Sequence, residues 1–574
     1  MLQKLTTSWG EALCGTPWTC YPRPQMRRES YVNLNGEWEF AVDPNSSRPE
    51  IFDRRIRVPF CPECALSGIE SHFPEGSWLF YRRTFALPDD FNKGRVLLHI
   101  GAADQEVSCY VNGKKLGRRI GGYRAVTFDI TDALQRENTL VLRCKDDLTR
   151  KDHLYGKQTM NRGGMWYTPV SGIWQSVWLE SVPNQYIRKL NIENRGNCVT
   201  IDTGLDLPGT VTVRDLGVYP LEHGKVAITP EEPHLWSPED PYLYDFTVEV
   251  GQDRVESYFA LRSLEIKEVE GIQRLCLNGK PYFFHGLLDQ GYWPDGLFTP
   301  ASPEAYAWDI LEMKKLGFNT LRKHIKVEPE EFYYQCDKLG MIVFQDMVNN
   351  GDYAYFRDTV LPTLGVQTLS DINMHRNKAA RKAFLDGMEA TVNQLKNHPC
   401  ICYWTIFNEG WGQFDSSKVY EQFLKLDDTR FVDTTSGWWR CGKTQVDSRH
   451  IYFGQWRQLK KGDKPVVLSE FGGLTYAEEG HLFNPDNAYG YKTCKTKAEF
   501  RQGLEKLYRE VILPAIREKG LCAAIYTQVS DVEDEINGLT TYDRRVTKAD
   551  YAPMQALSRQ MQTAIQGKAP ALGR

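Results

Sequence analysis

Two glutamates in the second half of the chain each follow a short apolar segment. Residues 401–407 lead into Asn408 and Glu409, and residues 466–468 lead into Ser469 and Glu470. The second glutamate is followed by Phe471 and two glycines. Apolar runs of this length, rich in β-branched and aromatic residues, predict buried strands. Two carboxylates that meet at strand ends can hydrolyse a glycosidic bond, one as general acid/base and one as nucleophile. On these residues alone, the alternative is that each glutamate caps the helix that follows it.

The elements that would bring the two glutamates together are strands that alternate with helices over residues 266–574. The sequence predicts strands at 282–286, 318–322, 341–346, 401–408, 431–434, 451–453, 466–469 and 523–528, and helices at 303–316, 328–339 and 381–396. This alternation predicts a (β/α)8 barrel, with a doubly wound sheet as the alternative. In a barrel, chemistry takes place at the carboxyl ends of the strands, which is where both glutamates fall.

The first half of the chain contains short strands separated by turn residues. Residues 1–182 predict a β-sandwich, and residues 183–265 have the length and strand spacing of an immunoglobulin-like sandwich. The boundaries that we expect are therefore 1–182, 183–265 and 266–574.

Several motifs resemble glycoside hydrolase family 2, the family of β-galactosidases, β-glucuronidases and β-mannosidases. Residues 398–409, followed by 469–472, resemble the family's catalytic core. Residues 34–38, 110–114 and 171–179 resemble its jelly-roll sugar-binding domain, and 235–244 resemble its immunoglobulin-like domain. The resemblance covers essentially the whole chain. It implies a jelly roll, an immunoglobulin-like sandwich and a catalytic TIM barrel.

The resemblance also implies roles for individual residues. Glu409 would be the general acid/base and Glu470 the nucleophile of a retaining exo-β-glycosidase. Asn408 would bind the 2-hydroxyl of the sugar, and Arg322 would keep the nucleophile ionised and oriented. Tyr452 would hydrogen-bond the nucleophile, with His450 on the same face of its strand.

Further polar residues are candidates for lining the pocket. His285, Asp289 and Asp346 end other predicted strands, and Asp104 lies in a loop of the first domain that lines the pocket in relatives. Each is as readily explained as a capping or turn residue. Trp411 is a candidate sugar platform, and its burial near Glu409 would raise the pKa of that acid.

One motif departs from the family. The sequence after Arg322 is Lys323, His324 and Ile325, where many relatives have Arg-x-x-His-Tyr-Pro, so the role of His324 stays open.

The loop after the last strand gives the strongest indication of the sugar. It contains Asp531, Glu533, Asp534, Glu535 and Asn537, where β-glucuronidases have an Asn-x-Lys pair that binds the sugar carboxylate. Acids near the pocket would repel a uronate, which favours a β-galactoside. A β-glucuronide or β-galacturonide remains the alternative if another cation, Lys323 or Arg544, binds the carboxylate. An alternative of another class is a non-catalytic carbohydrate-binding protein, which would not need both glutamates.

Composition limits the partners. The net charge of −4 gives no reason to expect binding to nucleic acid, and no apolar run is long enough to span a membrane. The fourteen cysteines are scattered, and the N-terminus lacks the apolar segment of a signal peptide, so we expect a cytoplasmic protein. Cys61 and Cys64 form a lone C-x-x-C with no second pair at zinc spacing, and we expect no metal or organic cofactor. The partner is then a carbohydrate substrate, and the resemblance implies a homo-oligomer.

Overall fold

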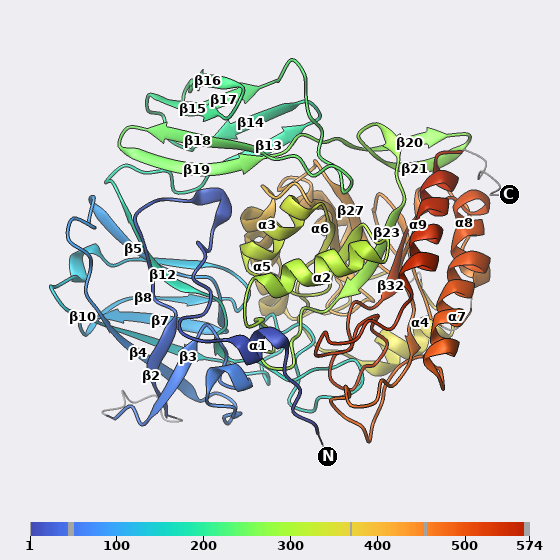
Figure 1. The fold of residues 1–574 in the computed structure, drawn as a ribbon, viewed down its shortest axis with the longest axis horizontal. Helices are drawn as coiled ribbons and strands as arrows, with labels where there is room; N and C mark the ends of the chain where they lie inside the picture. The colour runs from blue at the N-terminus through green and yellow to red at the C-terminus, as the bar shows by residue number, and fades with distance from the viewer. Residues whose placement is uncertain (1, 44–50, 368–369, 453, 455, 568–574) are drawn as a thin grey trace.

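The structure is a computed structural model that describes residues 2–43, 51–367, 370–452, 454 and 456–567. Three β-rich units follow one another along the chain. In Figure 1 the first unit lies at the left in blue, the second lies across the top in green, and the barrel with its helices fills the right-hand side.

The first unit is a sandwich of two antiparallel sheets. One sheet has the order β1 (Tyr31–Asn33), β12 (Val177–Val182), β5 (Arg95–Ile100) and β9 (Val126–Asp129). The other has the order β3 (Arg54–Val58), β2 (Gly36–Asp43), β4 (Trp78–Phe85), β10 (Asn138–Lys145), β7 (Glu106–Val111) and β8 (Lys114–Ile120). Side chains of β10 are buried at every second position, because one face of its sheet packs on the other sheet.

The second unit is a smaller sandwich. Its sheets are β13 (Asn191–Arg195), β14 (Cys198–Asp202) and β17 (Lys225–Ile228), and β16 (Gly217–Pro220), β15 (Gly209–Val213), β18 (Tyr244–Val250) and β19 (Asp253–Phe259). Two buried side chains fasten this unit to the barrel. Trp236 donates its indole N–H to the carbonyl of Asp337 at 2.8 Å, and Arg262 donates to the carbonyl of Ile401 at 2.8 Å.

A small antiparallel sheet leads into the barrel. It consists of β20 (Leu264–Val269), β21 (Ile272–Leu277) and β22 (Lys280–Pro281).

The barrel is one sheet of eight parallel strands. Its order is β27 (Phe431–Ser436), β26 (Ile401–Asn408), β25 (Ile342–Asp346), β24 (Thr320–Lys323), β23 (Phe284–Asp289), β32 (Leu521–Thr527), β29 (Val466–Gly472) and β28 (Asp447–Ile451). Nearly every residue of these strands is buried, because helices cover the outside and side chains fill the inside. The prediction of a barrel is confirmed.

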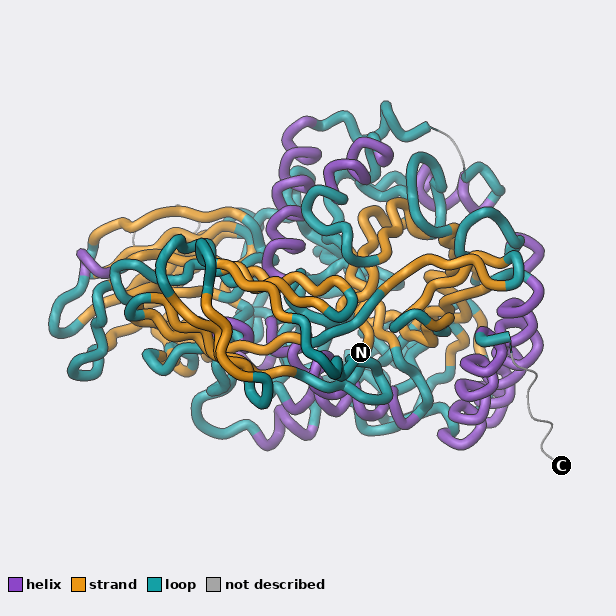
Figure 2. Tube along the Cα trace, turned by 90° about the horizontal axis from the view of Figure 1, so that it is seen from above, coloured by secondary structure: helices purple, strands orange, loops and turns teal. Residues whose placement is uncertain are grey.

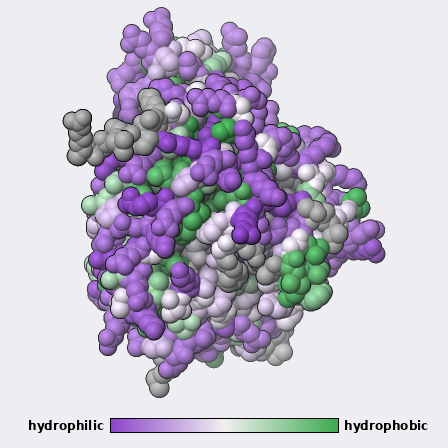
Figure 3. All heavy atoms as spheres, turned by 90° about the vertical axis from the view of Figure 1, so that its right-hand side faces the viewer, coloured by the Kyte–Doolittle hydropathy of each residue, from purple (hydrophilic) through white to green (hydrophobic). Residues whose placement is uncertain are grey.

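Helices surround the strands, as Figure 2 shows from above, with purple helices outside the orange strands of the barrel. They are α2 (Glu304–Lys315), α3 (Glu330–Leu339), α5 (Lys378–Leu395), α6 (Ser416–Phe423), α7 (Lys497–Leu507), α8 (Leu513–Glu518) and α9 (Tyr551–Ile565). The face in Figure 3, on the side of α7 to α9, is mainly hydrophilic with small apolar patches.

The ring closes between β27 and β28 through side chains. These two strands stand at opposite ends of the hydrogen-bonded order, so no backbone ladder joins them in the described part of the chain. Three serines bridge the seam instead. Ser436 donates to Ser469 at 2.9 Å, and the hydroxyls of Ser448 and Ser469 lie 2.6 Å apart.

Two further observations bear on the environment that we expected. All fourteen cysteines are free thiols. Among the described residues, no helix has the length and the apolar character needed to cross a membrane.

Candidate active site

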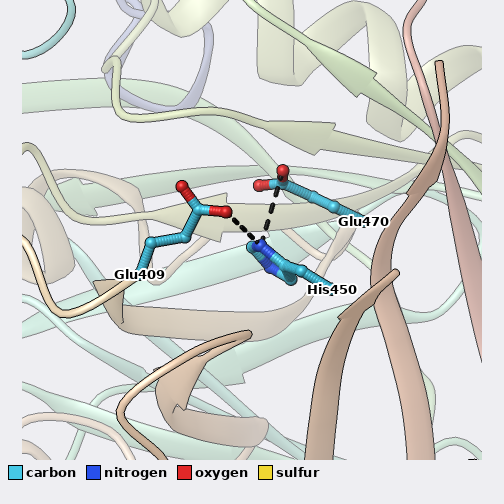
Figure 4. Close-up of side chains that lie close together, drawn as sticks. All are labelled: Glu409, His450 and Glu470. Atoms are coloured by element: carbon cyan, nitrogen blue, oxygen red, sulfur yellow. Dashed lines mark hydrogen bonds and ion pairs between the residues drawn. The ribbon is translucent and has the colours of Figure 1, made fainter. Parts of the chain in front are cut away.

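Glu409 and Glu470 meet at the carboxyl end of the barrel. Glu409 directly follows β26 with a positive φ of 56°, and its N–H donates to the carbonyl of Ser436 at 3.0 Å. Glu470 lies near the end of β29, where the pairing with β32 is irregular. One oxygen of each carboxylate lies within 4.8 Å of the other, and Figure 4 shows the two side chains turned toward the same space.

The His450 ring lies between the two carboxylates. Its Nδ1 is 2.7 Å from Oε1 of Glu409 and 3.5 Å from Oε2 of Glu470, as the dashed lines in Figure 4 indicate. Gly437 makes room for the ring: its φ is +80°, and a Cβ there would be 2.4 Å from Cγ of His450. The sequence placed His450 on the face of Tyr452 but did not reveal its contact with Glu409.

Arg322 ties the nucleophile candidate to its neighbours. Its guanidinium donates to Glu470 at 3.0 Å, to Asp346 at 2.9 Å and to Asn408 at 2.9 Å. Tyr452 also donates its hydroxyl to Oε2 of Glu470. The predicted residues Arg322, Asn408, Asp346 and Tyr452 therefore all lie in one network with Glu470.

This network determines the charge of Glu470. Burial alone would raise the pKa of Glu470, but the charges of His450 and Arg322 outweigh burial and lower the pKa to about 2. Glu470 is consequently ionised at neutral pH. Burial, followed by the charge of Glu470, holds the pKa of Tyr452 well above its usual value, so this phenol remains a donor.

Asp346 acts on the site through its neighbours. It is 1% exposed and accepts from Arg322, and its second oxygen is 2.7 Å from Nδ1 of His324. Burial lowers the pKa of His324. The structure thus places His324, whose role the sequence left open, beside Asp346 and 3.9 Å from Glu470.

The acids of the loop after β32 have different surroundings. Asp531 pairs with Lys548 at 2.6 Å, Glu533 accepts from the N–H of Thr168 at 3.0 Å, and Asp534 pairs with Arg162 at 3.0 Å. These three acids already have partners.

Glu535 is the acid of this loop that lies close enough to Glu470 to be affected by its charge. It accepts from Tyr167 and, at 2.9 Å, from Asn537. Burial, together with the nearby charge of Glu470, raises the pKa of Glu535. The structure therefore brings Glu535, with Asn537 beside it, toward the pocket.

Several predicted residues lie away from the two carboxylates. The prediction that His285 ends its strand is wrong: β23 runs from Phe284 to Asp289, so His285 stands near its beginning, packed 4.0 Å from the ring of Phe318. Burial lowers the pKa of His285 to about 3. Asp289 does end β23, but it pairs with Lys323 at 2.6 Å.

Asp104 and Trp411 lie around the site and not between the glutamates. Asp104 accepts from Gln158 at 3.0 Å inside the first unit, and burial raises its pKa to about 7. Trp411 is 4% exposed and packs against Trp166, 5.1 Å away, and Tyr353, 6.0 Å away.

Sequence reasoning missed the residues that the first unit and later loops contribute. Lys157 and Trp166 come from a loop of the first unit, and Tyr491 stacks on Tyr452 at 4.0 Å. These loops have no periodic pattern, so only the packing of the units shows where their side chains lie.

Glu409, His450 and Glu470 also form the one group of His, Cys, Asp and Glu side chains, among the described residues, that is close enough to hold a metal ion. Arg322 contacts the same carboxylate of Glu470, and its charge would repel a cation there. That no metal or cofactor is needed stays a prediction.

Comparison with known proteins covers all three units. The model "Glycosyl hydrolases family 2, TIM barrel domain" matches residues 267–561, "Glycosyl hydrolases family 2" matches 189–262, and "Glycosyl hydrolase 2 galactose-binding domain-like" matches 70–193. The boundaries 1–182, 183–265 and 266–574 themselves stay predictions.

Individual relatives carry two different activities in their names. The chain is 26% identical over 428 residues to a putative β-glucuronidase of Formosa agariphila, covering 68% of this chain and 48% of the relative. It is 26% identical over 428 residues to a β-galactosidase of an Arthrobacter species, covering 70% of this chain and 36% of the relative. The chain thus spans about half or less of the length of these two relatives.

A solved structure matches over nearly the whole chain. The β-glucuronidase of an uncultured Clostridium species superposes with a TM-score of 0.71 at 18% identity, covering 94% of this chain and 99% of that one. This likeness shows a shared fold. Because the barrel model alone matches more than half of the residues, the chain belongs to glycosyl hydrolases family 2.

Proposed function

We propose that the protein is a retaining exo-β-glycosidase that removes terminal β-linked sugars by double displacement. The observation that carries this proposal is the separation of the two carboxylates, whose nearest ligand oxygens lie within 4.8 Å. Retaining enzymes place their carboxyl groups about 5 Å apart, whereas inverting enzymes need about 6.5–9.5 Å to admit a water molecule.

The two steps follow from the surroundings of each acid. Glu409, whose side chain is 19% exposed, gives its proton to the glycosidic oxygen as the bond to the anomeric carbon breaks. The ionised Glu470 attacks that carbon and forms a covalent glycosyl–enzyme. Water then releases the sugar, giving its proton back to Glu409 and its hydroxyl to the anomeric carbon.

The action on chain ends is supported by the first unit, which covers part of the barrel mouth. The N–H groups of Tyr155 and Gly156 donate to the carbonyl of Asn349 at 3.3 and 3.2 Å, just beyond β25. A loop in this place would restrict access to the carboxyl ends of the strands, which suits a single terminal sugar.

The sugar has two candidate classes. A β-galactoside was expected because the acids after β32 would repel a uronate. Since Asp531, Glu533 and Asp534 have partners of their own, that repulsion comes mainly from Glu535, whose pKa is raised by burial. β-Galactosides and β-uronides are therefore both candidate substrates, and relatives with each activity in their names support both.

The test is hydrolysis of 4-nitrophenyl β-glycosides by the wild type, Glu409→Gln and Glu470→Gln. We expect each variant to lose at least about 100-fold in kcat on the preferred sugar. Glu312→Gln is the matched control, because Glu312 is a 4% exposed glutamate on the outer helix α2. A 2-fluoro glycoside of the preferred sugar should label Glu470, as mass spectrometry of its peptide would show.

Two results would contradict the proposal. Hydrolysis that survives in both glutamine variants would remove the site assignment. A wild type that binds sugars but cleaves no glycoside would favour the non-catalytic carbohydrate-binding protein.

A further inference from the structure

Lys157 reaches the barrel mouth from the first unit on a segment that is held at both sides. On one side, Tyr155 donates its hydroxyl to the carbonyl of Gly351 at 2.5 Å, and Gly156 packs so closely that a Cβ would be 3.1 Å from the carbonyl oxygen of Ile325. On the other side, the carbonyl of Lys157 accepts from the N–H of Tyr167 at 3.1 Å. The position of Lys157 is therefore fixed relative to β24, β25 and the residues beyond them.

Tyr167 connects this segment to the pocket. Its N–H contacts Lys157, and its hydroxyl donates to Glu535. The Lys157 ammonium accordingly lies close enough to affect three ionisable groups by its charge: it lowers the pKa of Glu470, of His324 and of Glu535, although in all three burial has the larger effect. The backbone contacts point to the same place: Gly156 packs against Ile325, which directly follows His324, and Tyr167, which is bonded to the carbonyl of Lys157, contacts Glu535.

Lys157 is nevertheless uncommitted. It is partly buried, and among the described residues no carboxylate lies within ion-pair distance of its ammonium. The two cations that the sequence offered for a uronate are both occupied. Lys323 pairs with Asp289 at 2.6 Å and with Glu328 at 2.9 Å, and Arg544 faces Asp309 at 3.4 Å.

We propose that Lys157 binds the carboxylate of a β-linked uronic acid, so that the first unit supplies the residue that selects an anionic sugar. This inference rests on the proposed glycosidase function and narrows its substrate class. A lysine whose backbone is held at the barrel mouth, and whose ammonium has no carboxylate partner among the described residues, is suited to an incoming anion. Glu535, held by Tyr167 and Asn537, is the acid that opposes it.

The test compares matched pairs of substrates that differ only at C6. These are 4-nitrophenyl β-glucuronide against β-glucoside, and β-galacturonide against β-galactoside, each with the wild type and Lys157→Met. The wild type should prefer the uronide of at least one pair. The variant should lose about 10- to 100-fold in kcat/KM on that uronide and change little on the neutral partner, as expected for one charge-assisted hydrogen bond.

Two variants control for other effects. Lys151→Met removes a lysine of the same loop that donates to the carbonyl of Leu148, and it should keep the wild-type preference. Lys157→Arg keeps the positive charge and should recover part of the uronide activity. Equal melting temperatures of the three variants would exclude misfolding.

Binding separates this inference from the proposed function. Calorimetry with free glucuronate and galacturonate needs no catalysis, and the wild type should bind at least one uronate about 10-fold or more tightly than Lys157→Met does. An unchanged ratio of uronide to neutral-sugar activity in Lys157→Met, or equal uronate affinity of the two proteins, would overturn the role of Lys157. Loss of all glycoside hydrolysis in the wild type would instead overturn the proposed function.

Discussion

Replacing Arg322 with methionine should lower the stability of the fold and raise the pKa of Glu470, and both effects can be measured as a function of pH. The guanidinium is 1% exposed at its side chain and is shared by Glu470 and Asp346. Glu470 has a pKa of about 2 against a reference of 4.5, and each pKa unit corresponds to about 1.4 kcal/mol. The depressed pKa is therefore worth about 3 kcal/mol of folding stability, to which both His450 and Arg322 contribute.

The free energy of unfolding of Arg322→Met should be lower than that of the wild type by about 3–5 kcal/mol, because two buried carboxylates lose a partner. A depressed pKa stabilises the folded state above pH 4.5, and this stability is lost as the pH falls toward 2. The difference in unfolding free energy between wild type and variant should thus be largest at pH 7 and should decrease below pH 4.5. Urea titrations of the full chain at pH 7, 5 and 4 would measure it.

The same variant should raise the pKa of Glu470, the proposed nucleophile, so the fall of kcat/KM on the acidic side, its acidic limb, should move to higher pH. The control is Arg430→Met, since Arg430 is a mostly buried arginine paired with Asp427 at 3.0 Å outside the catalytic network. It should lower stability and leave the acidic limb in place. Arg322→Met with an unchanged acidic limb and an unchanged difference in stability across this pH range would refute the electrostatic role of Arg322.

Two further predictions concern the neighbours of the carboxylates. Tyr452→Phe removes the hydroxyl that donates to Glu470 and should lower kcat about 10- to 100-fold with little change in melting temperature; an unchanged kcat would contradict the contact. Gly437→Ala should displace the His450 ring and lower kcat, and it should also destabilise the protein by about 1–3 kcal/mol because its φ is +80°. Gly251→Ala, at φ +59° with open space around its Cβ position, should lower stability alone; equal kcat in both variants would show that the ring is not displaced.

The sequence predicts the barrel and its catalytic strands because the signal is local. The apolar run before Glu409 is long and uninterrupted, and β26 ends at Asn408 as expected. His285 shows where a local pattern fails. The aromatic residues before it suggested a strand that ends early, whereas β23 continues through Leu287 and Leu288 to Asp289.

The selectivity of the pocket could not be predicted in the same way. The sequence shows four acids after the last strand, but only the fold reveals that Asp531 pairs with Lys548 and that Glu535 contacts Tyr167 of the first unit. Lys157 was not identified at all, because it stands in an aperiodic loop far along the chain from the barrel. Contacts between distant segments, and not propensity or periodicity, determine which charges remain unpaired.

The seam between β27 and β28 has a consequence for motion. Elsewhere in the ring, neighbouring strands share backbone hydrogen bonds, but here Ser436, Ser448 and Ser469 hold the edges together through hydroxyl groups. Hydroxyl contacts can exchange partners without breaking a backbone ladder, so separating the two strands here costs less free energy than separating paired strands. His450 stands on one edge and Gly437 follows the other, so small openings of the seam would shift the imidazole relative to Glu409. The strands that carry Arg322 and Asp346 are joined to each other by a backbone ladder, so an opening at the seam would change the surroundings of His450 before it changed theirs.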